Sequence, residues 1–178
     1  MHNFENPQEC SAILREVCKT FESLSETCLQ LLCEIVIFYP AAFVNDLEAI
    51  GNITYAAIRS NSERISILGM EVWILIGNFE YSRIEDGLST LGYIETAGES
   101  LVSLLLPKLF GKSEDDIWTE SKASYTTLCG IFQVTGNKHF DKIFNFIQEC
   151  LNVMENEVST QAALFAVASF FESPDKKP

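Results

Sequence analysis

The sequence predicts an all-α fold in which pairs of helices stack into an α-solenoid. Apolar residues recur at steps of three and four, and no stretch alternates like a half-buried strand. Eight helical stretches follow one another with short joints, as in a row of antiparallel hairpins. Small residues mark the second helix of each pair at intervals of 39, 57 and 39 positions, namely Thr27, Ser66, Ala123 and Ala162. This spacing indicates a repeat of about forty residues.

A two-helix unit of this length is typical of HEAT repeats, in which small residues let the second helix approach its neighbour closely. Pro7 opens a first helix that runs to about Glu22, Ser25 caps a second, and Pro40 stops the second helix. The later helices are expected over about 44–59, 62–78, 94–110, 122–135, 139–154 and 158–171. We therefore expect one solenoid over residues 1–178, with repeats at about 7–39, 43–78, 89–135 and 139–172 and a frayed tail at 173–178.

The composition is that of a folded and strongly acidic protein. Hydrophobic residues make up 47% of the 178 residues and charged residues 21%, and the formal net charge is -13. Such a surface repels the phosphates of nucleic acids and favours basic partners. We therefore expect no binding to nucleic acid.

The six cysteines fall inside apolar helical patterns, and no two of them form a C-x-x-C pair. His2 and His139 are far from any group of cysteines along the chain, so we expect free thiols in a reducing compartment and no metal ion or cofactor. No apolar run approaches the ~20 residues that a membrane-spanning helix needs, and no signal region is present. These observations predict a cytosolic or nuclear protein without membrane insertion.

An acidic run that ends in a tryptophan lies between two apolar helical patterns. Glu114, Asp115 and Asp116 are adjacent, and Trp118 follows after Ile117. Neighbouring carboxylates repel one another unless a cation neutralises them, and an indole offers a face on which arginine or lysine can stack. The run is therefore either a binding site for a cationic partner or a solvated loop whose tryptophan packs on the core.

Three segments carry a family resemblance, namely Ile67–Trp73, Leu104–Leu109 and Glu114–Trp118. They resemble the importin-β family of nuclear transport receptors. The segment Ile67–Trp73, followed by Asn78, is similar to the inner helix of the family's seventh HEAT repeat. Leu104–Leu109 is similar to the proline-bearing outer helix of the next repeat. Glu114–Trp118 stands where the family carries an acidic loop that ends in tryptophan. The resemblance runs from about Ser11 to Pro174 and implies four consecutive repeats, the sixth to the ninth.

The resemblance implies that the inner helices and the acidic loop bind an importin-α-type adaptor or a basic cargo, and also the GTPase Ran. The loop is shorter than is usual in the family, and both Ile117 and Asn78 stand where the family has an acidic residue. Trp73 lies among apolar residues, which favours a place in the core. The candidates for these contacts are Glu71, Asn78, Glu114, Asp115, Asp116, Trp118 and Glu120.

The outer helices of the family bind FG-repeat nucleoporins in shallow apolar slots, which implies that the protein is found in the cytoplasm and nucleus and at the nuclear pore. Apolar residues at helical spacing lie in the core in most proteins, so we expect one or two of the candidates to line a slot. These candidates lie on the first and third helices, and they are Ile13, Val17, Phe21, Phe43, Ile50 and Ile53. Because the ends of a solenoid expose apolar faces, we also expect self-association.

The sequence does not favour an enzyme. Gly111-Lys112-Ser113 resembles the end of a phosphate-binding loop, but Leu106 stands where that loop has a glycine. No G-x-S-x-G or H-E-x-x-H motif occurs, and two histidines leave little scope for acid–base chemistry near neutral pH. The alternative to a transport receptor is a HEAT-repeat scaffold unrelated to nuclear transport, which uses the acidic run for another basic partner.

Overall fold

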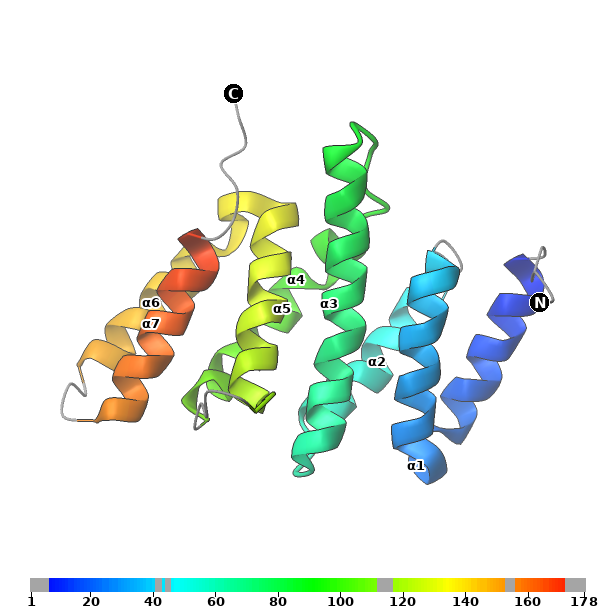
Figure 1. Ribbon diagram of the computed structural model, residues 1–178, viewed down its shortest axis with the longest axis horizontal. Helices are drawn as coiled ribbons and strands as arrows, with labels where there is room; N and C mark the ends of the chain where they lie inside the picture. The colour runs from blue at the N-terminus through cyan, green and yellow to red at the C-terminus, as the bar shows by residue number, and fades with distance from the viewer. Residues whose placement is uncertain (1–6, 41–42, 44–45, 112–116, 153–155, 172–178) are drawn as a thin grey trace.

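The computed structural model describes residues 7–40, 43, 46–111, 117–152 and 156–171 (Figure 1). Within these residues the chain is helical and contains no strand, which confirms the predicted all-α class. The helices are α1 (Pro7–Phe38), α2 (Leu47–Ile58), α3 (Glu63–Glu85), α4 (Tyr93–Leu105), η2 (Leu106–Phe110), α5 (Glu120–Thr135), η3 (Gly136–His139), α6 (Phe140–Leu151) and α7 (Glu157–Phe171), where η denotes a 3₁₀-helix.

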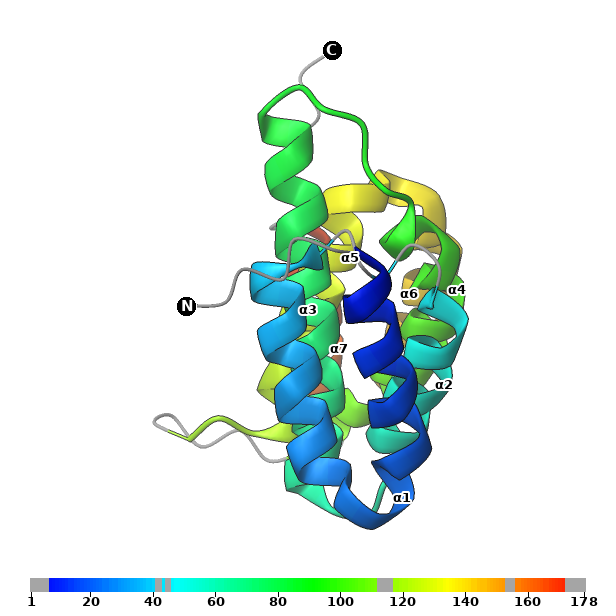
Figure 2. The ribbon, with the colours of Figure 1, turned by 90° about the vertical axis from the view of Figure 1, so that its right-hand side faces the viewer.

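The helices form two layers that run along the whole molecule. Figures 1 and 2 show that α1 bends into two arms. Its second arm lies in one layer with α3, α5 and α7, which we call the odd layer. The first arm of α1 lies in the other layer with α2, α4 and α6, which we call the even layer. In the odd layer α1 contacts α3, α3 contacts α5 and α5 contacts α7, while α1 and α7 lie at opposite ends. Each unit thus contacts its neighbours in a row, as the predicted α-solenoid requires.

The prediction of two separate helices before Pro40 is wrong. The structure has one helical run, Pro7–Phe38, that bends back on itself to give two arms (Figure 2). Thr20 and Cys28 bring their Oγ1 and Sγ atoms within 3.5 Å across the bend, although eight residues span about 12 Å in a straight helix. Ser25 therefore lies inside the run and does not begin a helix. No glycine or proline interrupts residues 22–25, so nothing in the sequence forces the backbone out of helical geometry there.

Proline and glycine lie at two other helix ends. The end at Gly136 agrees with the prediction, whereas the single helix predicted over 94–110 is divided after Leu105. The α-helical hydrogen bonding of α4 stops at Leu105, and the tighter helix η2 contains Pro107 near its start, because proline has no N–H to donate. Gly136 has a φ of 62° and ends α5, since this backbone region favours glycine. Pro107 and Gly136 thus lie where α4 and α5 end.

Small side chains lie where α3, α5 and α7 pack against their neighbours. Ser66, Ala123 and Ala162 are completely buried, as expected for residues that permit close helix packing. The Ser66 hydroxyl donates to the Ile58 carbonyl at 3.0 Å and so ties α3 to the end of α2. Thr27 is exposed, so the corresponding prediction for this residue is wrong.

Trp73 belongs to the core, as predicted. Its side chain is 1% exposed, its indole N–H donates to the Thr54 hydroxyl at 2.8 Å, and it stacks on Tyr55 with ring centroids 6.0 Å apart. A buried indole needs such an acceptor, because an unpaired N–H in the core would be costly. Trp73 therefore joins α3 to α2 and leaves Trp118 as the tryptophan that a partner can reach.

The joint between α3 and α4 depends on a buried carboxylate that the sequence did not reveal. Glu80 on α3 is 0% exposed, and its two oxygens accept the backbone N–H groups of Tyr93 and Ile94 at 2.9 Å each. These N–H groups begin α4 and have no partner within that helix. The Tyr93 hydroxyl donates to the Pro40 carbonyl at 3.1 Å, so residues from three successive helix pairs meet at this point.

Candidate functional site

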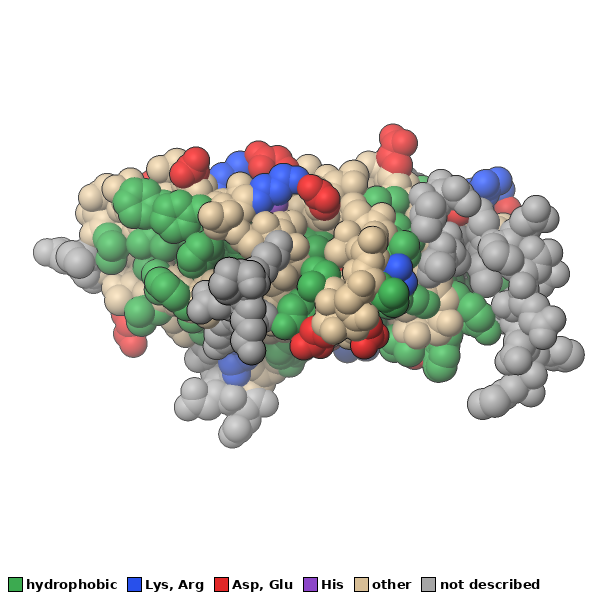
Figure 3. All heavy atoms as spheres, turned by 90° about the horizontal axis from the view of Figure 1, so that it is seen from above, with side chains coloured by type: hydrophobic (Ala, Val, Ile, Leu, Met, Phe, Trp, Pro, Cys, Tyr) green, Lys and Arg blue, Asp and Glu red, His purple; other side chains and the backbone are tan. Residues whose placement is uncertain are grey.

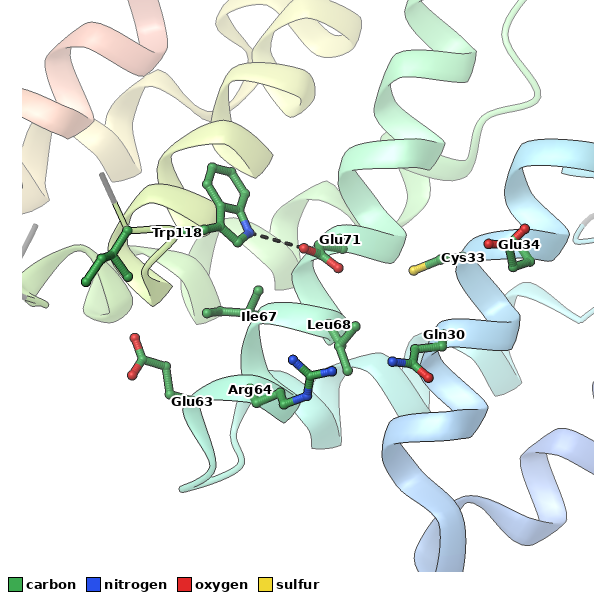
Figure 4. A pocket seen from close by; sticks show the side chains of 10 residues that line it. Gln30, Cys33, Glu34, Glu63, Arg64, Ile67, Leu68, Glu71 and Trp118 are labelled. Carbon is green, nitrogen blue, oxygen red and sulfur yellow. Dashed lines mark hydrogen bonds between the residues drawn. The ribbon is translucent and has the colours of Figure 1, made fainter. Parts of the chain in front are cut away.

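A pocket of about 620 Å³ opens on the odd layer between the second arm of α1 and α3, and we call it the α1–α3 pocket (Figure 4). The residue pair Ile117 and Trp118, which follows the acidic run, forms part of its wall. The lining residues are Gln30, Cys33, Glu34, Glu63, Arg64, Ile67, Leu68, Glu71, Ile117 and Trp118.

The pocket combines apolar surface with an excess of negative charge. Leu68 is buried, and Ile67 and Cys33 pack against the core, so these side chains offer apolar surface inside the pocket. Among the described lining residues, three carry carboxylates, namely Glu34, Glu63 and Glu71. Arg64 is the single cation among these residues, and it already pairs with Glu26 at 2.6 Å. A ligand with an apolar stem and a cationic head fits both features.

The wall of the pocket is held in place by hydrogen bonds to α3. The Trp118 indole N–H donates to Glu71 Oε1 at 3.1 Å, across 47 residues of sequence (Figure 4). The backbone N–H of Glu120 donates to Glu63 Oε1 at 3.3 Å. Trp118 remains 45% exposed, so one face of the indole is open to a partner. The structure thus brings together two of the predicted site residues, Glu71 and Trp118.

The electrostatic effect of these carboxylates extends to the thiol across the pocket. Burial and, to a smaller extent, the nearby charges of Glu71 and Glu34 together raise the pKa of Cys33 to about 12. The thiol therefore stays protonated at neutral pH and is a poor nucleophile. Figure 4 shows the Cys33 sulfur pointing from α1 towards Glu71. The cysteine thus contributes apolar surface to the pocket.

The other candidates for a basic partner lie in different settings. Asn78 is exposed on α3, seven residues after Glu71, and two helical turns bring both onto the same face of the helix. The Glu120 carboxylate pairs with Lys108 of η2 at 2.5 Å, so its charge is already balanced within the chain. Glu114, Asp115 and Asp116 lie outside the described residues.

The described candidates for nucleoporin binding lie in the core or pack against it. Phe43 and Ile50 are 0% exposed and Ile53 is 8% exposed, so these side chains line no open slot in this conformation. Ile13 is half-buried and packs against the same core. The side chains of Val17 and Phe21 lie outside the described part of α1. The expectation of a slot between the first and third helices therefore receives no support from Phe43, Ile50 or Ile53.

A second pocket, of about 370 Å³, opens between η2 and α6, and we call it the η2–α6 pocket. Phe110 and Phe146 meet edge to face there, with ring centroids 5.4 Å apart, and Phe110 is 41% exposed. Sequence reasoning missed this pocket, because only the fold brings the two phenylalanines together. Its lining residues are Ser103, Leu106, Pro107, Phe110, Phe146, Glu149, Cys150 and Ser159.

Phenylalanines gather at the α7 end of the stack, where Figure 3 shows an exposed apolar patch. Phe140 stacks on Phe144 and contacts Phe170, which in turn contacts Phe171. Phe140, Phe144 and Phe171 are exposed. Self-association through this end of the stack stays a prediction.

The histidine among the described residues lies in the core. His139 is 4% exposed, and burial lowers its pKa below the usual histidine value. Its Nε2 atom has no hydrogen-bond partner among the residues described. Within the same residues no group of histidine, cysteine or acidic side chains could hold a metal ion.

None of the described helices is long and apolar enough to cross a membrane.

Comparison with known proteins points to one receptor. No protein-family model matches the chain. Importin subunit beta-1 of Arabidopsis thaliana is 25% identical over an alignment of 190 residues, which covers 97% of this chain and 22% of that protein. The chain therefore spans about 22% of the length of this relative.

Solved structures share the fold at lower identity. Yeast importin-β (Kap95p) matches with a TM-score of 0.85 and 22% identity, over 97% of this chain and 22% of that one. Kap95 in complex with Nup1 gives a TM-score of 0.84 at 22% identity, over 98% of this chain and 22% of that one. Kap95p bound to RanGDP gives 0.80 at 22% identity, over 92% of this chain and 21% of that one.

These matches confirm the resemblance that the segments Ile67–Trp73, Leu104–Leu109 and Glu114–Trp118 indicated. The likeness extends over nearly the whole chain, both in sequence and in the stacking of its helices. In sequence and in fold, the chain is similar to a segment of the nuclear transport receptor importin-β.

Proposed function

We propose that the chain acts in nuclear transport as an importin-β-like receptor segment and that its α1–α3 pocket binds a basic segment of a cargo or adaptor. The proposal is carried by one observation, the meeting of Glu71 and Trp118 at a pocket that also holds Glu34 and Glu63. A lysine or arginine side chain could lay its stem on Ile67 and Leu68 and its charge beside these carboxylates. Similarity to importin-β supports a role without catalysis.

The charge of the whole chain favours the same class of partner. A net charge of -13 attracts a basic segment from a distance and speeds the encounter. Charge pairs at an open pocket are screened over about 8–10 Å at physiological ionic strength. Binding should therefore depend strongly on salt, and this dependence separates a charge-driven site from an apolar one.

The test is the affinity of a lysine- and arginine-rich peptide for the wild type, Glu71→Gln and Trp118→Ala at two salt concentrations. Each variant should weaken binding by about three- to tenfold, because each removes one charged or stacking contact of roughly 1 kcal/mol. Trp118→Ala should act mainly by speeding dissociation. Stopped-flow mixing gives both rate constants.

Glu48→Gln is the matched control. Glu48 is exposed on α2 in the even layer, and its substitution changes the net charge by the same amount as Glu71→Gln. It should leave binding almost unchanged. If salt has no effect, or if Glu71→Gln behaves like Glu48→Gln, the residues at Trp118 belong to a solvated connection and the pocket is not the binding site.

A second partner class is supported by the η2–α6 pocket. We propose that it accepts a phenylalanine of an FG-repeat nucleoporin, because the exposed side chains of Pro107 and Phe110 line it, with Phe146 packed edge to face against Phe110. The structure of Kap95 with Nup1 supports a nucleoporin partner in proteins of this fold. Binding should be weak, since one phenylalanine buried in an open slot contributes only about 2 kcal/mol.

Titration with a phenylalanine–glycine peptide, followed by NMR, should shift the resonances of Phe110 and Phe146. Phe110→Ala should abolish these shifts, whereas Phe171→Ala, which removes an exposed phenylalanine outside the pocket, should not. Shifts confined to the odd layer would exclude the η2–α6 pocket as the site.

We further propose a contact with Ran on the odd layer, a place for the protein in the cytoplasm and nucleus, and association with the nuclear pore. The structure of Kap95p with RanGDP supports the first of these. The alternative is a HEAT-repeat scaffold outside nuclear transport. Such a scaffold would bind the basic peptide but neither the phenylalanine–glycine peptide nor Ran, so the same measurements separate the two functions.

A further inference from the structure

The α1–α3 pocket already contains hydrogen-bond donors supplied by the chain itself. Trp118 donates to Glu71 through its indole N–H at 3.1 Å, and Glu120 donates to Glu63 through its backbone N–H at 3.3 Å. In both cases the acceptor is the Oε1 atom of a carboxylate on α3. Each of these two carboxylates therefore meets an incoming cation with one oxygen already engaged.

An engaged oxygen affects arginine and lysine differently. A guanidinium binds a carboxylate best through two parallel hydrogen bonds, which use both oxygens. An ammonium is a compact charge that needs only one oxygen of each carboxylate and can lie between several of them. At Glu71 an arginine that pairs with both oxygens must therefore share Oε1 with the Trp118 indole or displace it, whereas a lysine can use Oε2 and leave the indole in place.

We propose that Trp118 is an internal ligand of Glu71 that makes the α1–α3 pocket select lysine over arginine. This inference rests on the proposed function, because it names the class of side chain that the same pocket accepts. Figure 4 shows the contact from which the inference is drawn: the Trp118 indole nitrogen points at the Glu71 carboxylate.

The opposing effect is stacking, because guanidinium groups stack well on indole faces. Trp118 is 45% exposed and could offer such a face. Stacking does not require the indole N–H, however, so the two effects can be separated. Trp118→Phe retains an aromatic face and removes the donor, whereas Trp118→Ala removes both.

The experiment measures the affinity of two peptides for the whole chain, one of lysine and alanine and one of arginine and alanine, matched in length and charge. Wild type should bind the lysine peptide about three- to tenfold more tightly, the range expected for one displaced hydrogen bond. Trp118→Phe should bring the ratio of affinities to about one or reverse it. Ile117→Ala is the control, because it removes a neighbouring side chain of the pocket that donates no side-chain hydrogen bond, and it should keep the preference.

Each other outcome decides against the inference. If wild type binds the arginine peptide more tightly and Trp118→Phe reduces that advantage, Trp118 is a stacking platform. If wild type binds the two peptides with equal affinity, the selection of lysine over arginine is wrong, but the proposed function is not affected. If neither peptide binds any of the proteins, the proposed function fails and the inference fails with it.

The hydrogen bond itself can be tested without a ligand. The chain has two tryptophans, so two indole N–H resonances report on the protein. Glu71→Leu should shift the Trp118 resonance and speed its exchange with water, while the Trp73 indole, which donates to Thr54 in the core, should be unchanged. Glu34→Leu, in the same pocket, is the control and should leave both resonances in place. An unmoved Trp118 resonance in Glu71→Leu would overturn the inference whatever the peptides do.

Discussion

Glu80→Ala should lower the free energy of unfolding by about 2–6 kcal/mol, since each of two buried N–H groups left without an acceptor costs about 1–3 kcal/mol. Glu80 is 0% exposed, and its carboxylate accepts the first N–H groups of α4 from Tyr93 and Ile94. Without it, two buried donors lose their acceptor and the start of α4 loses a favourable negative charge. The loss should reach beyond α4, because Tyr93 also bonds to the Pro40 carbonyl.

Urea denaturation followed by circular dichroism measures this loss as a fall in the midpoint. Glu80→Gln should lie between wild type and Glu80→Ala, since an amide oxygen can still accept one of the two N–H groups. Glu85→Ala removes an exposed carboxylate near the end of the same helix and should change stability by less than about 0.5 kcal/mol. Equal effects of Glu80→Ala and Glu85→Ala would show that the buried carboxylate does not hold the joint.

The helices could be predicted because their signals are local. Apolar periodicity gave the helical class, and Pro40 and Gly136 gave ends close to those observed. The bend in α1 was not predictable in the same way, since no residue there interrupts helical hydrogen bonding. Glu80 escaped notice because its partners follow 13 and 14 residues later, beyond a connection whose path only the fold determines.

The candidate site was predictable in its residue types but not in its contacts. Glu71 and Trp118 were singled out separately, through the family resemblance and the acidic run, and nothing in the sequence places one beside the other. Phe43 and Ile50 were named as candidates for a surface slot, but both lie in the core. An apolar side chain at helical spacing fits a core and a surface slot equally well, and only burial distinguishes them. For this reason the η2–α6 pocket became visible in the structure alone.

Gly69→Ala and Gly77→Ala, both within α3, should change stability in opposite directions. Alanine favours a helix over glycine by roughly 0.5–1 kcal/mol, so each substitution starts with the same gain. At Gly69 an added Cβ would lie 2.9 Å from Ala57 Cβ and 3.1 Å from the Thr54 carbonyl oxygen on α2. At Gly77 the nearest atom would be the Cα of Gly130 on α5, at 3.5 Å, which is an ordinary contact.

The clash at Gly69 involves backbone and a side chain without rotatable bonds, so α2 and α3 must move apart. Overpacking of this kind costs about 1–3 kcal/mol, which outweighs the helical gain and leaves a net loss of up to about 2.5 kcal/mol. Gly77→Ala should instead be neutral or stabilising by up to about 1 kcal/mol. Both changes add one methyl group to the same helix. A lower urea midpoint for Gly69→Ala than for Gly77→Ala would therefore show that α3 packs more closely against α2 than against α5. If Gly69→Ala were as stable as Gly77→Ala, α3 and α2 would not approach in solution as closely as the structure places them.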